Sequence, residues 1–198
     1  MFARSLAALL LTALPAFAQP VTVAALGDSL TQGYGLPPTR GFVPQLQAWL
    51  RAHGADVTLI NAGVSGDTSA GGLSRVNWTL TPEVDGLIVA LGGNDLLRGI
   101  DPALLVGLNA PPNYGGAYRN AFNAMFPELG AAHDVPVIPS MLGAIVAAGD
   151  PLSLMQPDGI HPNADGVRLV VNAMGPQVLK FVESLGACEG PCRPPSGS

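Results

Sequence analysis

The chain has 198 residues, of which 48% are hydrophobic and 12% are charged, and its formal net charge is −5. This length allows one domain, and so apolar a composition excludes a disordered chain. An acidic chain without a cluster of lysines and arginines also offers nucleic-acid phosphates no binding surface, which excludes a nucleic-acid partner.

Residues 1–18 are predicted to be a secretory signal peptide. Arg4 precedes an apolar run from Leu6 to Leu14, and Ala16-Phe17-Ala18 has the small-x-small pattern of a cleavage site. The alternative is a short membrane anchor or a buried helix, but the run is shorter than the ~20 residues that span a bilayer. We therefore expect residues 19–186 to form a periplasmic or secreted domain without stable membrane insertion.

Short apolar runs that alternate with helical patterns predict an α/β domain with a parallel sheet and helices on its faces. The predicted strands are residues 21–26, 57–60, 87–91, 104–108 and 135–138. Helices are predicted from Pro44 to Gly54, after the cap Asp67/Thr68, through Tyr118–Phe126, and from Pro162 to about Leu185. Pro176 is expected to kink the last helix.

The connection before Leu104 is unusually short. Only the Gly92–Asp95 turn and residues 96–103 separate it from the third strand, which is no more than the minimum of about a dozen residues that a parallel crossover needs, usually as a helix. Asp101-Pro102 also favours a turn over a helix. Either residues 104–108 are not a parallel neighbour of the third strand, or the sheet is abbreviated there.

The two cysteines, Cys188 and Cys192, lie in the C-terminal tail, residues 187–198. An oxidising compartment would favour a small-loop disulfide between them. Two thiolates without a nearby histidine are too few for a zinc site.

Polar residues gather where the predicted strands end, which is where open parallel sheets bind ligands. Ser29 follows the first strand, Gly63 the second and Asn94 the third, while Asp158 and His161 precede the last helix. A serine hydroxyl becomes a nucleophile only when a base takes its proton and a partner orients that base. The spacing of three residues lets Asp158 reach Nδ1 of His161 and leaves Nε2 to face Ser29.

An acyl-transfer site also needs donors for an oxyanion. The backbone N–H groups of Ser29 and Gly63 and the side-chain amide of Asn94 can converge from three strand ends. Each motif alone is weak, because Gly-Asp-Ser is usually a turn and Asp-x-x-His is more often a helix cap. Their occurrence together, in this order, favours a serine hydrolase site.

These motifs resemble the four blocks of the GDSL, or SGNH, hydrolase superfamily: Gly27-Asp28-Ser29-Leu30-Thr31, Gly63, Gly92-x-Asn94-Asp95 and Asp158-x-x-His161-Pro162. Residues 61–69, 97–101, 110–115 and 155–162 are similar to its bacterial periplasmic acyl-thioesterase, arylesterase and lysophospholipase members.

The resemblance implies a three-layer α/β/α sandwich with a mostly parallel, flavodoxin-like sheet, and no cofactor or metal. It implies an exported esterase or thioesterase that acts on small acyl substrates through an acyl-enzyme. The implied roles are Ser29 as nucleophile, His161 as base, Asp158 as its partner, and Ser29, Gly63 and Asn94 as oxyanion donors. Pro112 and Ile160 are the implied contacts to the acyl chain.

The chain departs from such relatives at one place. They carry a full helix and a turn where Ala103 here runs directly into Leu104, and we expect this loss to expose apolar surface. Two alternatives stay open. One is a carbohydrate-ester deacetylase on the same fold, since the fold and the triad do not fix the acyl group. The other, which the short connection favours, is a relative that folds poorly or only binds acyl ligands. The sequence does not indicate an oligomeric state.

Overall fold

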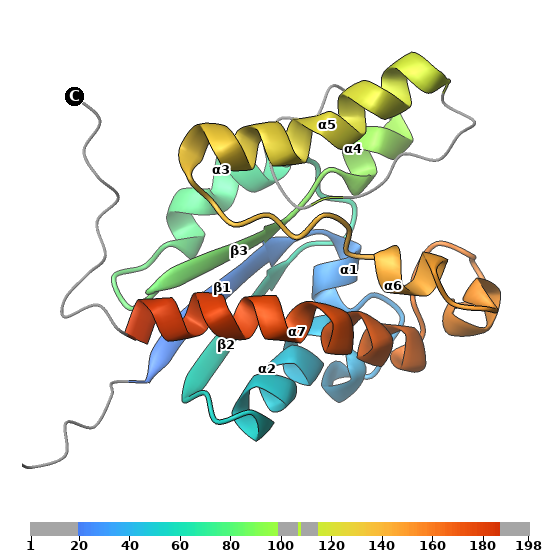
Figure 1. Cartoon of the computed structure of the whole chain (residues 1–198). Coiled ribbons are helices and arrows are strands. Elements are labelled where there is room, and N and C mark those ends of the chain that lie inside the picture. The colour runs from blue at the N-terminus through green and yellow to red at the C-terminus, as the bar shows by residue number, and fades with distance from the viewer. Residues whose placement is uncertain (1–19, 99–106, 108–114, 187–198) are drawn as a thin grey trace, which may run out of the picture.

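A computed structural model describes residues 20–98, 107 and 115–186. At its centre lies a parallel sheet in the order β2-β1-β3 (Figure 1), formed by β1 (Val21–Gly27), β2 (Val57–Gly63) and β3 (Gly86–Ala90). Gly27 of β1 pairs with Gly63 on one side and with Ala90 on the other. The carboxyl ends of all three strands therefore meet at one edge, and the first three predicted strands are confirmed.

The helices are α1 (Ser29–Gln32), α2 (Phe42–Ala52), α3 (Ser69–Thr79), α4 (Gly93–Arg98), α5 (Gly116–His133), α6 (Gly143–Val146) and α7 (Ala164–Gly186). Two 3₁₀ turns accompany them, η1 (Pro38–Arg40) and η3 (Pro151–Leu154). All four predicted helices are present, although Gly93–Asp95, predicted as a turn, begins α4. Pro176 lies inside α7, which continues to Gly186.

One face of the sheet is covered by α2 and α7, which pack together (Figure 1). Phe42, Leu46 and Leu50 recur at helical spacing along α2, and all three are fully or almost fully buried. They join the alternate β1 residues Val23 and Ala25 in the hydrophobic core. The core beneath the strand ends is thus densely packed on this side.

The opposite face is covered by α3 and α5, which lie across the sheet from α7 (Figure 1). Leu26 of β1 points to this face and is buried, as are Phe122 and Phe126 of α5, whose rings meet edge to face. The covering is less complete here, because Leu73 of α3 is 73% exposed and Trp78 is 86% exposed. Helices on both faces make the molecule the predicted three-layer α/β/α sandwich, with an abbreviated sheet.

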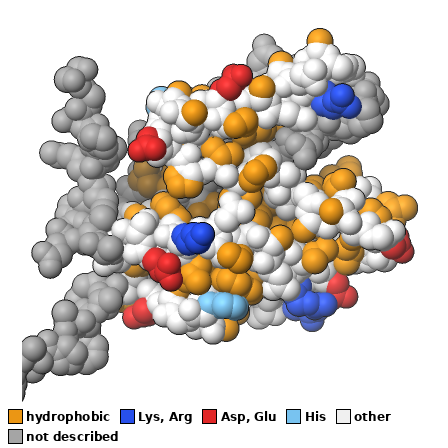
Figure 2. All heavy atoms as spheres, in the orientation of Figure 1, with side chains coloured by type: hydrophobic (Ala, Val, Ile, Leu, Met, Phe, Trp, Pro, Cys, Tyr) orange, Lys and Arg blue, Asp and Glu red, His pale blue; other side chains and the backbone are white. Residues whose placement is uncertain are grey.

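The prediction of a strand at residues 135–138 is wrong. These residues are not in a strand, and they flank an apolar cavity of about 290 Å³ between β3 and α7. A fourth strand would have to pair with them, and the only described residue in that region is Gly107. Its N–H donates to Ile138 O, and its carbonyl oxygen accepts from Met141 N. A strand needs a hydrogen-bonded neighbour along its length, and the described residues supply one only at its end. Figure 2 shows hydrophobic side chains reaching the surface between α5 and α7.

Several predictions lie outside the described residues: the signal peptide, the cysteine-containing tail, Pro112, and the connection from residue 99 to Leu104, with all of the strand at 104–108 except Gly107. Among the helices that are described, none is long and apolar enough to cross a bilayer.

Candidate active site

Ser29 is placed by the sharp turn that follows β1. Asp28 caps α1, because its Oδ1 accepts a hydrogen bond from Leu30 N at 3.0 Å. Gly27 has no room for a side chain, since a Cβ there would collide with the side chain of Thr31 and with Ala90 O. The tight turn therefore brings Ser29 to the carboxyl edge of the sheet as the first residue of α1.

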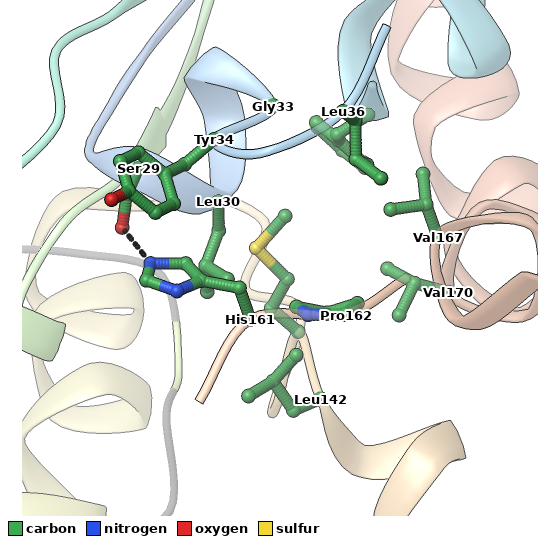
Figure 3. Close-up of a pocket in the computed structure, with 12 residues that line it drawn as sticks. Ser29, Leu30, Gly33, Tyr34, Leu36, Leu142, His161, Pro162, Val167 and Val170 are labelled. Carbon is green, nitrogen blue, oxygen red and sulfur yellow. Dashed lines mark hydrogen bonds between the residues drawn. The ribbon is translucent and has the colours of Figure 1, made fainter. Parts of the chain in front are cut away.

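Asp158 and His161 lie in the loop between η3 and α7, and they reach Ser29 in series. Asp158 Oδ2 lies 2.7 Å from His161 Nδ1, and His161 Nε2 lies 2.9 Å from Ser29 Oγ (Figure 3). Asp158 Oδ1 accepts the backbone N–H groups of Ile160 and His161. The three predicted side chains, separated by 132 positions along the chain, are thus brought together.

The charge of this series follows from its hydrogen bonds. The backbone N–H of His161, then its ring and the N–H of Ile160, lower the pKa of Asp158 to about 2. The carboxylate is therefore ionised at neutral pH and can accept a hydrogen bond from Nδ1–H of His161. In this tautomer, assigned from the hydrogen-bond network, Nε2 is left as an acceptor for the Ser29 hydroxyl.

Asn94 lies beside the turn that carries Ser29. Its Nδ2 donates to Asp67 O at 2.9 Å and reaches Asp28 Oδ2 only at 3.5 Å. Burial raises the pKa of Asp28 to about 6, against the opposing effect of the Leu30 N–H. One Asn94 N–H is therefore firmly held, and the other is held weakly enough for a better acceptor to take it.

Gly63 lies next to this turn, but its N–H already donates to Asn61 Oδ1 at 3.0 Å. It can serve an oxyanion only if Asn61 gives up that bond. Gly66 has a φ of 82° and lies in the same loop as Asp67, which Asn94 contacts. The sequence analysis did not name Gly66 as a candidate oxyanion donor, although the Ser-Gly-Asp turn after β2 could have indicated it.

Two exposed side chains flank His161. Ile160, predicted to contact substrate, is 51% exposed, and the ring of Tyr34, which was not predicted, lies with its centroid 4.7 Å from that of His161. Behind Ser29 and His161 the cavity is only about 10 Å³, room for about one water. Apolar side chains line it, among them Leu30, Leu36, Met141, Leu142 and Val170 (Figure 3). A cavity of this size has no room for an acyl group.

A serine at a strand end, bonded to a histidine that an aspartate orients, is the arrangement on which serine hydrolases rely. The GDSL-like lipase/acylhydrolase family model matches residues 25–110, which include Ser29 and Asn94. With the relatives below, this match shows that the chain belongs to the GDSL-like lipase/acylhydrolase family.

Curated relatives match most of the domain. Esterase TesA of Pseudomonas aeruginosa is 38% identical over 162 residues, which cover 71% of this chain and 79% of that protein. "Thioesterase 1/protease 1/lysophospholipase L1" of Escherichia coli K12 is 33% identical over 183 residues, covering 81% of this chain and 85% of that protein.

A solved structure agrees with the fold. The crystal structure of AlinE4, described as an SGNH-hydrolase family esterase, is 37% identical and superposes with a TM-score of 0.66, covering 83% of this chain and 98% of that chain. The match to the Pseudomonas esterase spans 162 residues but only 71% of this 198-residue chain, so part of that alignment has no counterpart here.

Proposed function

We propose that the protein hydrolyses carboxylic esters or thioesters of small acyl groups, with Ser29 as its nucleophile. The observation that carries the proposal is the series Asp158–His161–Ser29, with distances of 2.7 and 2.9 Å. The matched relatives, which are named as an esterase and as a thioesterase and lysophospholipase, support the same reaction class.

In this mechanism His161 Nε2 takes the proton from Ser29 Oγ as the oxygen attacks the acyl carbonyl carbon. The tetrahedral intermediate collapses when the imidazolium gives its proton to the leaving alcohol or thiol, and an acyl-Ser29 ester remains. Water, deprotonated by the same nitrogen, then attacks that ester and releases the carboxylic acid. The ionised Asp158 stabilises the imidazolium in both halves of the reaction.

The oxyanion of each tetrahedral intermediate accepts from the N–H of Ser29 and from Asn94 Nδ2. Asn94 supplies the N–H that otherwise reaches Asp28 Oδ2 at 3.5 Å, so it loses little by turning to the oxyanion. A third donor comes from the segment after β2. Gly63 is the donor that the sequence indicates, and Gly66 is the alternative that the contact between Asn94 and Asp67 favours.

The acyl or leaving group lies on the open side of Ser29. Tyr34 and Ile160 are about half exposed there and offer apolar contact surface, and we assign Pro112 to the same side. Cleavage of residues 1–18 would place the enzyme outside the cytoplasm, and sequencing the N-terminus of the secreted or periplasmic protein tests that assignment.

A serine-directed fluorophosphonate and p-nitrophenyl esters of short and medium acids test the proposal. The protein should hydrolyse the esters without added metal and bind one phosphonate per chain, and Ser29→Ala should abolish both. Ser153→Ala is the matched control, because Ser153 is exposed and donates to Asp150 O in η3. Full activity in Ser29→Ala, or loss of activity in EDTA, would remove Ser29 from this role.

A further inference from the structure

Gln156 lies in the loop that carries Asp158 and His161, and the sequence analysis gave it no role. Its side-chain Nε2 donates to Tyr34 O at 2.8 Å and to Pro162 O at 3.0 Å. Its backbone N–H donates to His161 O at 2.7 Å. Gln156 thus joins the two ends of residues 155–162, here called the histidine loop, and ties that loop to the segment that follows Ser29.

These bonds close a ring around the site. Tyr34 N donates to Ser29 O at 3.0 Å, Gln156 Nε2 donates to Tyr34 O, Gln156 N donates to His161 O, and His161 Nε2 meets Ser29 Oγ. Among the described residues, the bonds from Gln156 to Tyr34 and from His161 to Ser29 are the only hydrogen bonds that join residues 155–162 to residues 29–36. The first of them does not involve the reacting atoms.

The histidine loop needs such a tie because residues 157–160 are exposed. An exposed loop has few packing contacts to fix it, yet proton transfer depends on a nitrogen–oxygen distance that tolerates little change.

Gly35, which follows Tyr34, also indicates that the Gln156 side chain belongs at this place. A Cβ at Gly35 would collide with Gln156 Oε1, and the φ of Gly35 is 74°. The chain therefore leaves room at position 35 into which the Gln156 amide fits.

We propose that Gln156 is a positioning residue, which sets the distance between His161 Nε2 and Ser29 Oγ by tying the histidine loop to Tyr34. The inference rests on the proposed function for its catalytic consequence. Gln156 does not touch the acyl group, so it acts on the rate through His161 and leaves substrate affinity alone.

Gln156→Ala and the isosteric Gln156→Glu test the inference. A glutamate keeps the size of the side chain but cannot donate to the two carbonyl oxygens, so both variants should lower kcat about tenfold to hundredfold. KM should stay within about twofold, and phosphonate labelling should slow in parallel with kcat yet still reach one per chain. Gln45→Ala is the matched control, because Gln45 Nε2 also joins two carbonyl oxygens, those of Arg40 and Ala164, but bonds to no residue of 155–162.

A second pair of variants moves the amide without replacing it. Gly35→Ala should reproduce the loss of kcat by displacing Gln156. Gly54→Ala should not, because Gly54 has a similar φ of 89° with nothing within 4 Å of its Cβ position. The proton NMR signal of His161 Nδ1–H should shift in Gln156→Ala and Gly35→Ala and stay in place in both controls.

The outcomes separate the two proposals. If the wild-type protein neither hydrolyses esters nor binds the phosphonate, the proposed function fails, and the NMR signal alone decides on Gln156. If the wild type is active and Gln156→Glu matches Gln45→Ala in kcat, in labelling rate and in the NMR signal, Gln156 is not a positioning residue. A rise in KM alone would make Gln156 a substrate contact and would equally overturn the inference.

Discussion

On one face of the sheet α7 alone buries eight residues, whereas on the other face α3 buries only two, Ser69 and Gly72. The contrast continues into the candidate site. Asp158 and His161 lie in the loop that leads into α7, and Asn163, which follows them, caps that helix by accepting from the N–H groups of Asp165 and Gly166.

Asn94 instead begins α4, and its partner Asp67 precedes α3, so this half of the site rests on the less well covered face. Arg75 of α3 compensates in part. It binds Asp67 Oδ2 at 2.7 Å and donates to the strand-end carbonyl oxygens Gly27 O and Ala62 O. Local hydrogen bonds can therefore hold the site's geometry where the helix above it packs little apolar surface.

Asp158→Asn should give the largest effect of the variants below. An asparagine can hold His161 in the wrong tautomer, and the loss of kcat from such a change is about 10⁴-fold in a serine protease. In the wild type, kcat/KM should rise with pH, because only the unprotonated Nε2 of His161 can take the proton from Ser29. A stopped-flow or plate assay from pH 5 to 9 measures both, and a flat wild-type profile would contradict the assignment of His161 as base.

Asn94→Ala tests the half of the site on the less covered face. Loss of one oxyanion donor should lower kcat about 10²- to 10³-fold with little change in KM. Circular dichroism should show an intact fold, since α4 is short. A variant in which KM alone rises would make Asn94 a substrate-binding residue instead.

Leu46→Ala and Leu73→Ala compare the two faces directly. Leu46 of α2 is fully buried, so its truncation should cost about 2–5 kcal/mol of unfolding free energy. Leu73 of α3 is 73% exposed, and its truncation should change that free energy by less than about 0.5 kcal/mol. Urea denaturation measures both, and equal losses would mean that α3 is as well packed as α2.

Asp28→Asn probes the buried carboxyl beside Ser29. Because its folded pKa of about 6 exceeds the unfolded 3.8, Asp28 favours the folded state below about pH 4 and loses that contribution as pH rises through 6. The variant keeps the cap on α1 and lacks the titration. Its stability relative to wild type should rise by about 1–3 kcal/mol from pH 4 to pH 7. A constant difference across that range in urea titrations would contradict the raised pKa.

The double variant Leu73→Ser, Trp78→Ser should reduce self-association of the protein. Both side chains are exposed on α3, where apolar surface favours contact between copies. Analytical ultracentrifugation of wild type and variant measures the change, with Leu152→Ser, 76% exposed in η3, as the control. A wild type that is monomeric at high concentration would contradict this prediction.

The three strands β1, β2 and β3 and the helices α2, α3, α5 and α7 could be predicted from the sequence, because each has an apolar run or a helical spacing of its own. Residues 21–26 form an apolar run of strand length, and Phe42, Leu46 and Leu50 recur at helical spacing. Residues 135–138 carry a similar apolar run and yet form no strand. The run specifies burial, but a strand also needs a neighbour, and neighbours come from the tertiary structure.

For the site, the sequence by itself determined which side chains carry the chemistry and that Asp158 could reach His161, since three residues separate them on one turn. Only the tertiary structure decided that His161 meets Ser29 across 132 positions of chain and that the N–H of Gly63 is taken by Asn61. It alone also showed that Gln156 joins the histidine loop to Tyr34. Hydrogen bonds between distant segments depend on how the strands and α7 pack, and a local pattern of residues does not encode that packing.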